Sequence, residues 1–537
     1  MAAPTYTEDL TDIVLAESGD TGWTNFTTNQ QGLPSDDPDY PYIQGNQAWS
    51  QTCSKSKTYG NMGFDFGTPI SLPTDGAFLI WQLFAIPTAI DDYAGTTTGD
   101  AGLHVLIGQN TTNYDWWYVG GSDISPNPYG GFQCHAVNTT VSPDNSTGTR
   151  TSDQVIGAGV ALTSYPPKGQ PHSIDAIRYG RCSAIFQLGE SADPATFDGF
   201  AAVNDTGSNR WGLLQETAGG YLWQGRLLLG STSAVYFLDS NKTIFIKWTP
   251  KVTTNFNTIE IQHADSYVSW TGITFQVLDT STASRGRLIM TDPADVYIDQ
   301  CTFGDMSTFN FDATSGVNTV EITNTTFRRC SGVYQGGATF NGDSFLNFDS
   351  TSSLFSDDLD LISNCSFESD GSNHAIELDA NHAGSSFTLT NCTYTNYETS
   401  NGSTGNEPIY NNSGGHVTIN VVGGDYPYYR NGAGATTTII QTINWYFKIV
   451  DAAGDIVNTA EFRIYDSNLN QLFGVETSDG TELYQFDGAI SGTTAIVRVH
   501  DLNYLHNSQT LSHPSTSNTA AAPTVIVLAV DRVYDNP

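Results

Sequence analysis

The chain has 537 residues, of which 20 are lysine or arginine and 56 are aspartate or glutamate, giving a formal net charge of −36. Binding to phosphates needs basic patches, so this shortage of basic residues argues against nucleic acid and anionic membranes as partners. No apolar stretch is long enough to cross a bilayer, and the first residues have neither the basic nor the apolar segment of a secretory signal. A chain of this length predicts about three domains.

Residues 1–210 carry short strands with alternating polarity, such as 77–83 and 102–107, separated by loops rich in glycine, proline and aspartate. This pattern predicts an antiparallel sandwich. The segment 115–120, Asp-Trp-Trp-Tyr-Val-Gly, resembles a strand of the concanavalin-like jelly rolls. The resemblance implies a jelly-roll-like sandwich for this part of the chain.

A short motif recurs through the middle of the chain, and self-similarity of this kind indicates a repeat architecture. Each copy has a short apolar strand, a polar turn residue, a small residue and an aromatic residue. The copies end at Phe275, Phe303, Phe327, Phe367 and Tyr394, at intervals of 28, 24, 40 and 27 residues. Intervals near 25 suit one turn of a parallel β-solenoid with three strands per turn. The interval of 40 predicts an insertion, with loops at 336–337 and 342–343.

Stacked coils place equivalent side chains above one another at the strand spacing of about 4.8 Å. We therefore expect an apolar inner ladder, a ladder of small residues beside it and a row of turn asparagines, because asparagine tolerates left-handed backbone. The inner ladder is predicted at Ile298, Ile322, Ile362 and Leu389, the small residues at Cys301, Thr325, Cys365 and Cys392, and the turns at Asn324, Asn364 and Asn391. Asp360 stands where the other copies begin with an apolar residue.

These repeats resemble the right-handed parallel β-helix family, which includes pectate-lyase-like enzymes and phage tailspikes. The resemblance covers about residues 211–440. It implies a right-handed parallel β-helix there. It leaves function open, because the same solenoid hosts lyases, hydrolases, adhesins and inert stalks.

The segment 431–440 is rich in glycine, alanine and threonine and is predicted to be a linker. After it come a strand, an Asp-x-x-Gly turn at 451–454, a strand at 460–466 and a closing strand at 524–530. This order resembles the small transthyretin-like sandwiches of immunoglobulin type. The chain is therefore predicted to be all-β, with a jelly-roll-like sandwich at 1–210, a parallel β-helix at 211–440 and an immunoglobulin-like sandwich at 441–537.

The candidate catalytic residues are Glu377 and Asp379, flanked by His374 and His382. Two residues apart on a strand, the carboxylates would share a face, and a glycosidase needs two carboxyl groups about 5–10 Å apart. The main interpretation is a solvated outer face of the solenoid, which leaves no catalytic residue. The catalytic pair is the alternative.

A lyase would need aspartates for Ca²⁺ and a basic residue to remove a proton. Arg328 and Arg329, with Asp299 one coil earlier, are the only candidate set, and the competing interpretation is that these arginines pair with local acids in a turn. No cofactor motif or metal-ligand spacing is present, so neither a cofactor nor a metal is predicted. The seven cysteines form no Cys-x-x-Cys pair, which predicts free, buried thiols.

Aromatic residues supply the remaining candidate site. Trp116, Trp117 and Tyr118 are adjacent, so at least one must point away from the core of a strand. An exposed ring there could stack on a sugar or cover a subunit interface, and both interpretations stay open.

Modular β domains, few basic residues and no catalytic set together resemble the virion proteins of tailed phages. The resemblance implies a non-enzymatic structural protein, either a capsid decoration or spike or a tail fibre component, that stabilises the particle or contacts host surface glycans. Its expected partners are other virion proteins and two further copies of itself in a homotrimer, and its expected location is the virion after synthesis in the host cytoplasm. The alternatives are a tailspike-type polysaccharide depolymerase or lyase acting in the β-helix groove, and a monomeric lectin.

Overall fold

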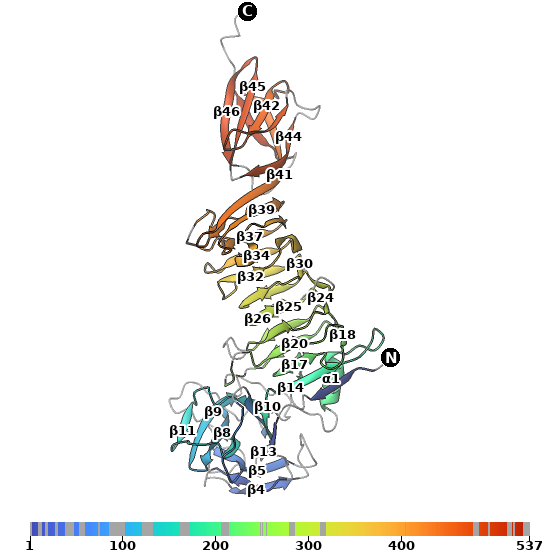
Figure 1. The fold of residues 1–537 in the computed structure, drawn as a ribbon, viewed down its shortest axis with the longest axis vertical. Coiled ribbons are helices and arrows are strands. Elements are labelled where there is room, and N and C mark those ends of the chain that lie inside the picture. The colour runs from blue at the N-terminus through green and yellow to red at the C-terminus, as the bar shows by residue number, and fades with distance from the viewer. Residues whose placement is uncertain are drawn as a thin grey trace, which may run out of the picture. The chain divides into compact units, whose positions relative to one another are not determined.

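The structure is a computed structural model (Figure 1). It describes residues 3–8, 13–16, 20–26, 31–37, 48–52, 59–73, 76–84, 102–120, 133–161, 171–205, 214–217, 219–247, 249, 251–253, 255–278, 285–311, 318–402, 404–475, 483–491, 494–512, 518 and 521–529. The chain divides into two compact units, residues 1–320 with 329–331, and residues 321–328 with 332–537. Strands dominate both units, so the predicted all-β class is confirmed.

The first unit begins with two six-stranded sheets whose strands pair antiparallel. One has the order β10-β7-β13-β5-β4 with β2 beside β13, and the other has the order β11-β9-β8-β12-β6-β3. The strands are β2 (Ile13–Ala16), β3 (Trp23–Asn25), β4 (Gln31–Asp37), β5 (Ala48–Thr52), β6 (Tyr59–Asp65), β7 (Ala77–Phe84), β8 (Gly102–Asn110), β9 (Asn113–Gly120), β10 (Gln133–Val137), β11 (Asn145–Thr147), β12 (Val155–Ala161) and β13 (Pro171–Gly180).

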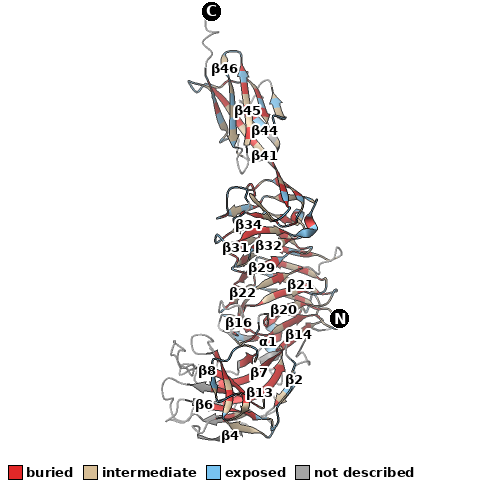
Figure 2. Cartoon of the chain, turned by 60° about the vertical axis from the view of Figure 1, so that its left-hand side comes forward, coloured by how far each residue is buried: buried red, intermediate tan, exposed pale blue. Residues whose placement is uncertain are grey.

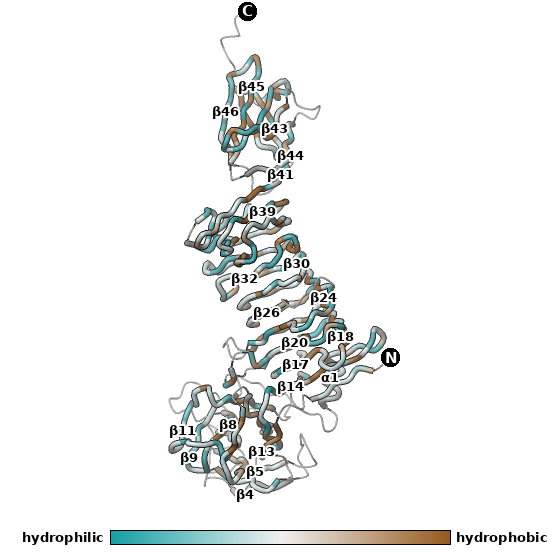
Figure 3. The backbone as a smooth tube through the Cα atoms, viewed as in Figure 1, coloured by the Kyte–Doolittle hydropathy of each residue, from teal (hydrophilic) through white to brown (hydrophobic). Residues whose placement is uncertain are grey.

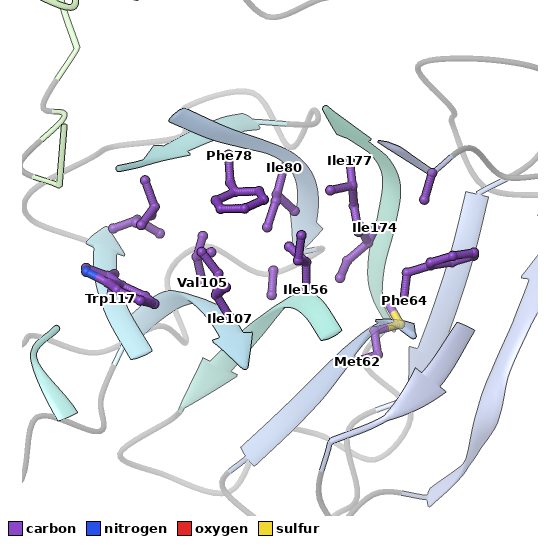
Figure 4. Packing of buried hydrophobic residues seen from close by; sticks show 14 of the residues in the cluster. Met62, Phe64, Phe78, Ile80, Val105, Ile107, Trp117, Ile156, Ile174 and Ile177 are labelled. Carbon is purple, nitrogen blue, oxygen red and sulfur yellow. The ribbon is translucent and has the colours of Figure 1, made fainter. Parts of the chain in front are cut away.

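Alternate residues of both sheets meet in one hydrophobic core. Phe78 and Ile80 of β7 lie in the same buried cluster as Val105 and Ile107 of β8 (Figure 4). Hydrophobic stretches run through β8 and β13 (Figure 3). This part of the chain is therefore a two-layer sandwich, as the alternating sequence pattern predicted.

Parallel coils follow in the same unit. Three sheets of parallel strands pair each strand with its equivalent in the next coil, which gives three strands per coil. The strands are β14 (Ser183–Gln187), β17 (Arg226–Leu229), β20 (Thr258–Ile261), β23 (Arg287–Met290) and β26 (Thr308–Asn310); β16 (Gly220–Trp223), β19 (Thr243–Ile246), β22 (Thr274–Val277) and β25 (Thr302–Gly304); and β18 (Tyr236–Ser240), β21 (Tyr267–Thr271) and β24 (Asp295–Asp299). Parallel pairing begins at β14, earlier than the predicted boundary at residue 211.

Other elements cover the first coil. An uncovered strand edge would leave unpaired backbone groups that could pair with another chain. Strand β1 (Thr5–Glu8) pairs antiparallel with β14, and β15 (Leu214–Thr217) pairs antiparallel with β16. Helix α1 (Phe197–Asp205) brings Phe200 to 4.8 Å from the ring of Phe186 in β14. These additions close the end of the solenoid with pairing and aromatic packing.

The second unit contains parallel coils of the same kind. Their strands are β27 (Val320–Thr323), β30 (Thr339–Asn341), β33 (Ile362–Ser363), β36 (Ser386–Thr390) and β39 (His416–Val422); β28 (Thr326–Arg328), β31 (Ser344–Leu346), β34 (Ser366–Glu368) and β37 (Thr393–Thr395); and β29 (Gly332–Tyr334), β32 (Ser352–Ser356), β35 (His374–Leu378), β38 (Ile409–Asn411) and β40 (Tyr429–Asn431). Buried residues alternate with partly exposed ones along these strands (Figure 2).

The interval of 40 residues holds a whole extra coil, so the predicted insertion is wrong. Phe340 of β30 lies in register with Ile322 on one side and Ile362 on the other. Gly342 takes the left-handed turn position that asparagine holds in other coils, with φ +77°. The sequence motif did not match this coil, because glycine stands at the turn position and Asp343 stands where the other copies have a small residue.

The predicted ladders are confirmed within each unit. In the second unit Ile322, Ile362 and Leu389 are buried, and in the first Ile298 is buried in register with Trp270. The aromatic ends of the coils stack face to face, with ring centroids 5.2 Å apart for Phe327–Phe345, 4.8 Å for Phe345–Phe367, 5.7 Å for Phe367–Tyr394 and 5.3 Å for Phe275–Phe303. The turn residues Asn324, Asn364 and Asn391 all have positive φ.

The predicted linker at 431–440 is wrong, because strand β41 (Thr436–Asp451) runs without a break from the solenoid into the last domain. Its first part pairs parallel with β39, and its later part pairs antiparallel with β44 (Tyr484–Ser491). The segment 436–440, Thr-Thr-Thr-Ile-Ile, is β-branched throughout and favours a strand. One continuous strand therefore joins the β-helix to the terminal sandwich.

The terminal sandwich has two layers. Strands β44 and β47 (Thr524–Leu528) flank β41, and the other layer has the order β43-β42-β45-β46. Those strands are β42 (Glu461–Tyr465), β43 (Gln471–Val475), β45 (Thr494–Asp501) and β46 (Tyr504–Ser512). Trp445, Phe447, Phe462 and Tyr484 lie in its buried core. No helix among the described residues is long and apolar enough to span a membrane.

The predicted state of the cysteines is confirmed for the six that the structure describes, which are buried and in no disulfide, while Cys53 lies outside the described residues. Burial raises the pKa of Cys301 to about 11 and that of Cys392 to about 12. These thiols therefore stay protonated at neutral pH and serve as packing groups.

Replacing Phe345 by alanine should destabilise the protein strongly. Its ring is fully buried and stacks on both neighbouring coils, so truncation removes two stacking contacts and leaves a cavity. A loss of about 3–5 kcal/mol is expected for a buried phenylalanine. Denaturant unfolding of the full chain, followed by tryptophan fluorescence, measures this loss.

The control Val422→Ala, at a 44% exposed position of β39, should change stability by less than about 0.5 kcal/mol. Equal effects of the two variants would contradict the role given to the stack.

Candidate functional site

Five outward side chains form a continuous line across the second unit. Strand alternation buries Ile376 and Leu378 and turns Glu377 outward, and the neighbouring strands do the same. Cα register joins each member to the next. The line, here called the outer row, consists of Tyr334, Phe355, Glu377, Tyr410 and Arg430.

The aromatic members of the outer row are stacked. The rings of Tyr334 and Phe355 lie 4.6 Å apart and nearly parallel, and Tyr334 is 38% exposed. Tyr410 lies between two partners, with the ring of His374 at 4.9 Å and the guanidinium of Arg430 4.9 Å from its centroid. Most ring faces are therefore covered, and the row presents ring edges and polar tips.

Glu377 occupies the centre of the outer row, and its carboxylate is held in place. One oxygen accepts a hydrogen bond from the hydroxyl of Ser352 (2.8 Å) and the other from the amide of Asn412 (3.0 Å). The same Asn412 accepts a hydrogen bond from the hydroxyl of Tyr410 (3.3 Å). These bonds fix the carboxylate at a half-buried position beside the aromatic members.

His374 contacts two members of the outer row, Tyr410 and Arg430. Its Nδ1 donates to the carbonyl oxygen of Glu407 (2.7 Å), and its Nε2 accepts from Nη1 of Arg430 (3.4 Å). Burial lowers the pKa of His374, and the charge of Arg430 lowers it further. The imidazole is therefore neutral at neutral pH, in the tautomer that carries its proton on Nδ1.

The loop before β38 brings a second carboxylate, Glu407, near this group. Glu407 is 2% exposed, and its Oε2 has no hydrogen-bond partner among the described residues. A Cβ on Gly402 would lie 2.4 Å from its other oxygen, so glycine is needed for the loop to pass this close. Arg430 donates to the carbonyl oxygen of Gly405 (3.4 Å) and so ties the loop to β40.

Asp379 directly follows the strand that carries Glu377. Strand β35 ends at Leu378, and Asp379, which is exposed and still has an extended backbone, is the N-cap of the short 3-10 helix Ala380–His382. Its carboxylate accepts from the backbone of Asn381 (2.9 Å) and lies 2.9 Å from Nδ1 of His382. The shared face expected for Glu377 and Asp379 stays a prediction, and the role that the structure gives Asp379 is local capping.

Of the arginine set considered for a lyase, Arg329 is held by a local ion pair. Arg329 donates from two nitrogens to the buried carboxylate of Asp305, each at 2.7 Å. This bidentate pair raises the pKa of Arg329, so the arginine cannot serve as a base. No group of three His, Cys, Asp or Glu residues within the described part of the chain could hold a metal ion.

Trp116, Trp117 and Tyr118 are all buried, so the exposure expected for at least one of them is wrong. Trp117 lies in the core between the two sheets and donates to the carbonyl oxygen of Val141 (2.9 Å). Trp116 does point to the opposite face, but a second buried cluster that contains Phe26 and Tyr114 covers it. Neither indole offers an open surface for a sugar or a second subunit.

Of the residues that the sequence singled out, the structure brings Glu377 and His374 into the site. Sequence reasoning missed Tyr410, Arg430, Glu407 and Asn412. The signal for Tyr410 was present, because Ile409-Tyr410-Asn411 continues the pattern of Ile376-Glu377-Leu378 one coil later. Glu407 had no signal, since it lies in a loop without a repeat.

Comparisons with known proteins give no family. No family model and no curated protein matches the chain. Among solved structures, the chain is similar to the catalytic domain of a GH87 alpha-1,3-glucanase in complex with tetrasaccharides, at 9% identity and a TM-score of 0.17, covering 84% of this chain and 89% of the other. A thermostable GH87 alpha-1,3-glucanase catalytic unit from Streptomyces thermodiastaticus strain HF3-3 gives 11% identity and a TM-score of 0.17, with coverage of 84% and 92%. Values this low transfer neither a site nor an activity to this chain.

Acid should destabilise the protein partly through His374. The pKa of His374 is lower in the folded state than in the unfolded state, where it is about 6.5. The contribution of the neutral imidazole to the free energy of unfolding is therefore complete above that pH and is lost as the pH falls below it. The unfolding temperature of the wild type should therefore fall between pH 7.5 and 5.0, and that of His374→Gln should fall less. The exposed His416→Gln is the control and should keep the wild-type drop. An identical drop in all three proteins would contradict the assignment.

Proposed function

We propose that the protein binds a polysaccharide through the outer row. The observation that carries this proposal is the in-register line of Tyr334, Phe355, Glu377, Tyr410 and Arg430 across five adjacent strands. Proteins bind sugars through aromatic rings together with oriented hydrogen-bonding groups, and the row places Phe355 and Tyr410 on either side of the carboxylate of Glu377. Strands repeat at about 4.8 Å, so a chain molecule lying along the row meets a new side chain at every coil.

The polar members give the row its donors and acceptors. The carboxylate of Glu377 can accept from sugar hydroxyls, and Arg430 can donate to them. Both are already positioned, Glu377 by Ser352 and Asn412 and Arg430 by Tyr410. Preorganised groups lose little freedom on binding, which favours affinity.

A second candidate function is polysaccharide cleavage, which one observation favours. Glu377 is an oriented, half-buried carboxylate at the centre of the row, and a second carboxylate, Glu407, lies in the adjoining loop with an oxygen that has no partner among the described residues. Two carboxyl groups are the usual requirement for glycoside hydrolysis. In that case Glu377→Gln should abolish the release of reducing ends, while Asp379→Asn should not. Loss in Asp379→Asn alone would contradict this assignment.

Glu377→Gln should weaken polysaccharide binding about tenfold or more. The change keeps the shape of the side chain but removes the charge that strengthens its hydrogen bonds, worth about 1.5–3 kcal/mol each. A panel of bacterial surface polysaccharides first identifies a ligand of the wild type, and calorimetry then compares the variants.

The matched control is Glu321→Gln, which removes the same charge from an exposed position of β27 in a different sheet of the same unit. It should bind as the wild type does. No binding by the wild type to any member of the panel, or unchanged affinity in Glu377→Gln, would contradict the proposed site.

We further propose that the protein does this as a homotrimeric component of a tailed-phage particle. The support is the resemblance of the modular β architecture and the base-poor composition to virion proteins. Light scattering at micromolar concentration should give three times the 58.0 kDa of one chain. Its peptides should also be found by mass spectrometry in purified particles. A mass of one chain would contradict the trimer, and absence from the particles would contradict the virion role.

A further inference from the structure

The outer face of the terminal sandwich carries a concentration of basic residues that the β-helix site does not use. A hollow of about 230 Å³ lies on the sheet of β42, β45 and β46. Its lining residues are Glu461, Arg463, Tyr465, Arg498, His500 and His506. In a chain with 20 lysines and arginines against 56 acidic residues, two arginines against one glutamate around one hollow are a local excess of positive charge.

The two arginines occupy facing positions on neighbouring strands. Arg463 of β42 and Arg498 of β45 are directly opposite in the antiparallel register. Like charges at opposite positions of neighbouring strands destabilise a sheet. A bound anion between the guanidinium groups would remove that cost, and it would add charge-assisted hydrogen bonds.

The two guanidinium groups differ in their partners. Arg463 donates to the carboxylate of Glu461 and to the amide oxygen of Gln471 (3.3 Å), so part of its charge is already neutralised. Arg498 lies over the ring of Tyr465, 4.7 Å from its centroid, and forms no ion pair with a carboxylate of the described residues. Arg498 is thus positioned by stacking and has its donors available.

We propose that this hollow binds an oxyanion, the carboxylate, sulfate or phosphate group of an acidic sugar or the free inorganic ion. Arginine suits such groups because its planar donors match two oxygens at once. The volume admits a small anionic group or one sugar residue and is below the range of about 300–1,000 Å³ of larger ligands. His500 and His506 line the same hollow and supply further donors. This site is independent of the outer row.

Calorimetry of the full chain at low salt tests the proposal with three probes: sodium glucuronate, sodium sulfate and sodium phosphate. At least one probe should bind, and the probe that binds best distinguishes a sugar carboxylate from sulfate or phosphate. Arg498→Gln should weaken that binding about tenfold or more, and Arg498→Lys, which keeps the charge but not the planar fork, should weaken it less. Added sodium chloride should weaken it in the wild type.

The control Lys448→Gln removes one positive charge from β41, in the other sheet of the same sandwich, and should leave binding unchanged. The variant Glu377→Gln should also bind the probe normally, so that failure of the β-helix site and failure of this one are told apart. Retained wild-type thermal unfolding shows that Arg498→Gln is folded. No binding of any probe at 10 mM, or an equal loss in Lys448→Gln and Arg498→Gln, would overturn the proposal.

Discussion

Face-to-face stacking of inward aromatic rings, repeated at the spacing of parallel strands, is the interaction on which the solenoid depends. In the second unit Phe327, Phe345, Phe367 and Tyr394 continue one stack through four coils. A single coil has too little apolar surface to hold itself closed, so each ring is stabilised only by its neighbours. Because strand side chains alternate with period two, this inner register also fixes which residues face outward.

The outer row is a direct consequence of that register. A slip of one residue in β35 would turn Glu377 inward and Ile376 or Leu378 outward, which the buried neighbours of both forbid. The same constraint places Tyr410 and Arg430 beside Glu377, although 33 and 53 residues separate them from it in sequence. The solenoid thus converts distant positions into a contiguous surface, and local hydrogen bonds from Ser352 and Asn412 then orient it.

Sequence reasoning predicted what the repeat itself encodes. The inner ladders, the left-handed asparagines and the buried cysteines follow from residue type at a fixed place in the motif. Sequence reasoning failed where a coil departs from the motif, as at Gly342 and Asp343. The glycine turn and the buried aspartate do not match the motif, although the coil has the same strands as its neighbours. It also failed at 436–440, where neighbouring glycines suggested a linker and β-branched residues formed a strand that bridges two domains.

Only part of the candidate site could be predicted from the repeat. Glu377 stands out on a strand, but its partners come from other coils and from a loop without a repeat, which only the fold brings together. Trp116 and Trp117 show the opposite error, since strand alternation gave their two directions correctly and could not reveal that a second cluster covers the outer one. The exposure of a side chain depends on distant segments of the chain, so a local sequence pattern does not predict it.

A crystal structure of the protein soaked with an oligosaccharide of the polysaccharide it binds would test the central claim most directly. The account predicts sugar density along β29, β32, β35, β38 and β40, with hydroxyl groups within hydrogen-bond distance of Glu377 and Arg430. Density elsewhere on the protein, with the outer row left free of sugar, would contradict it.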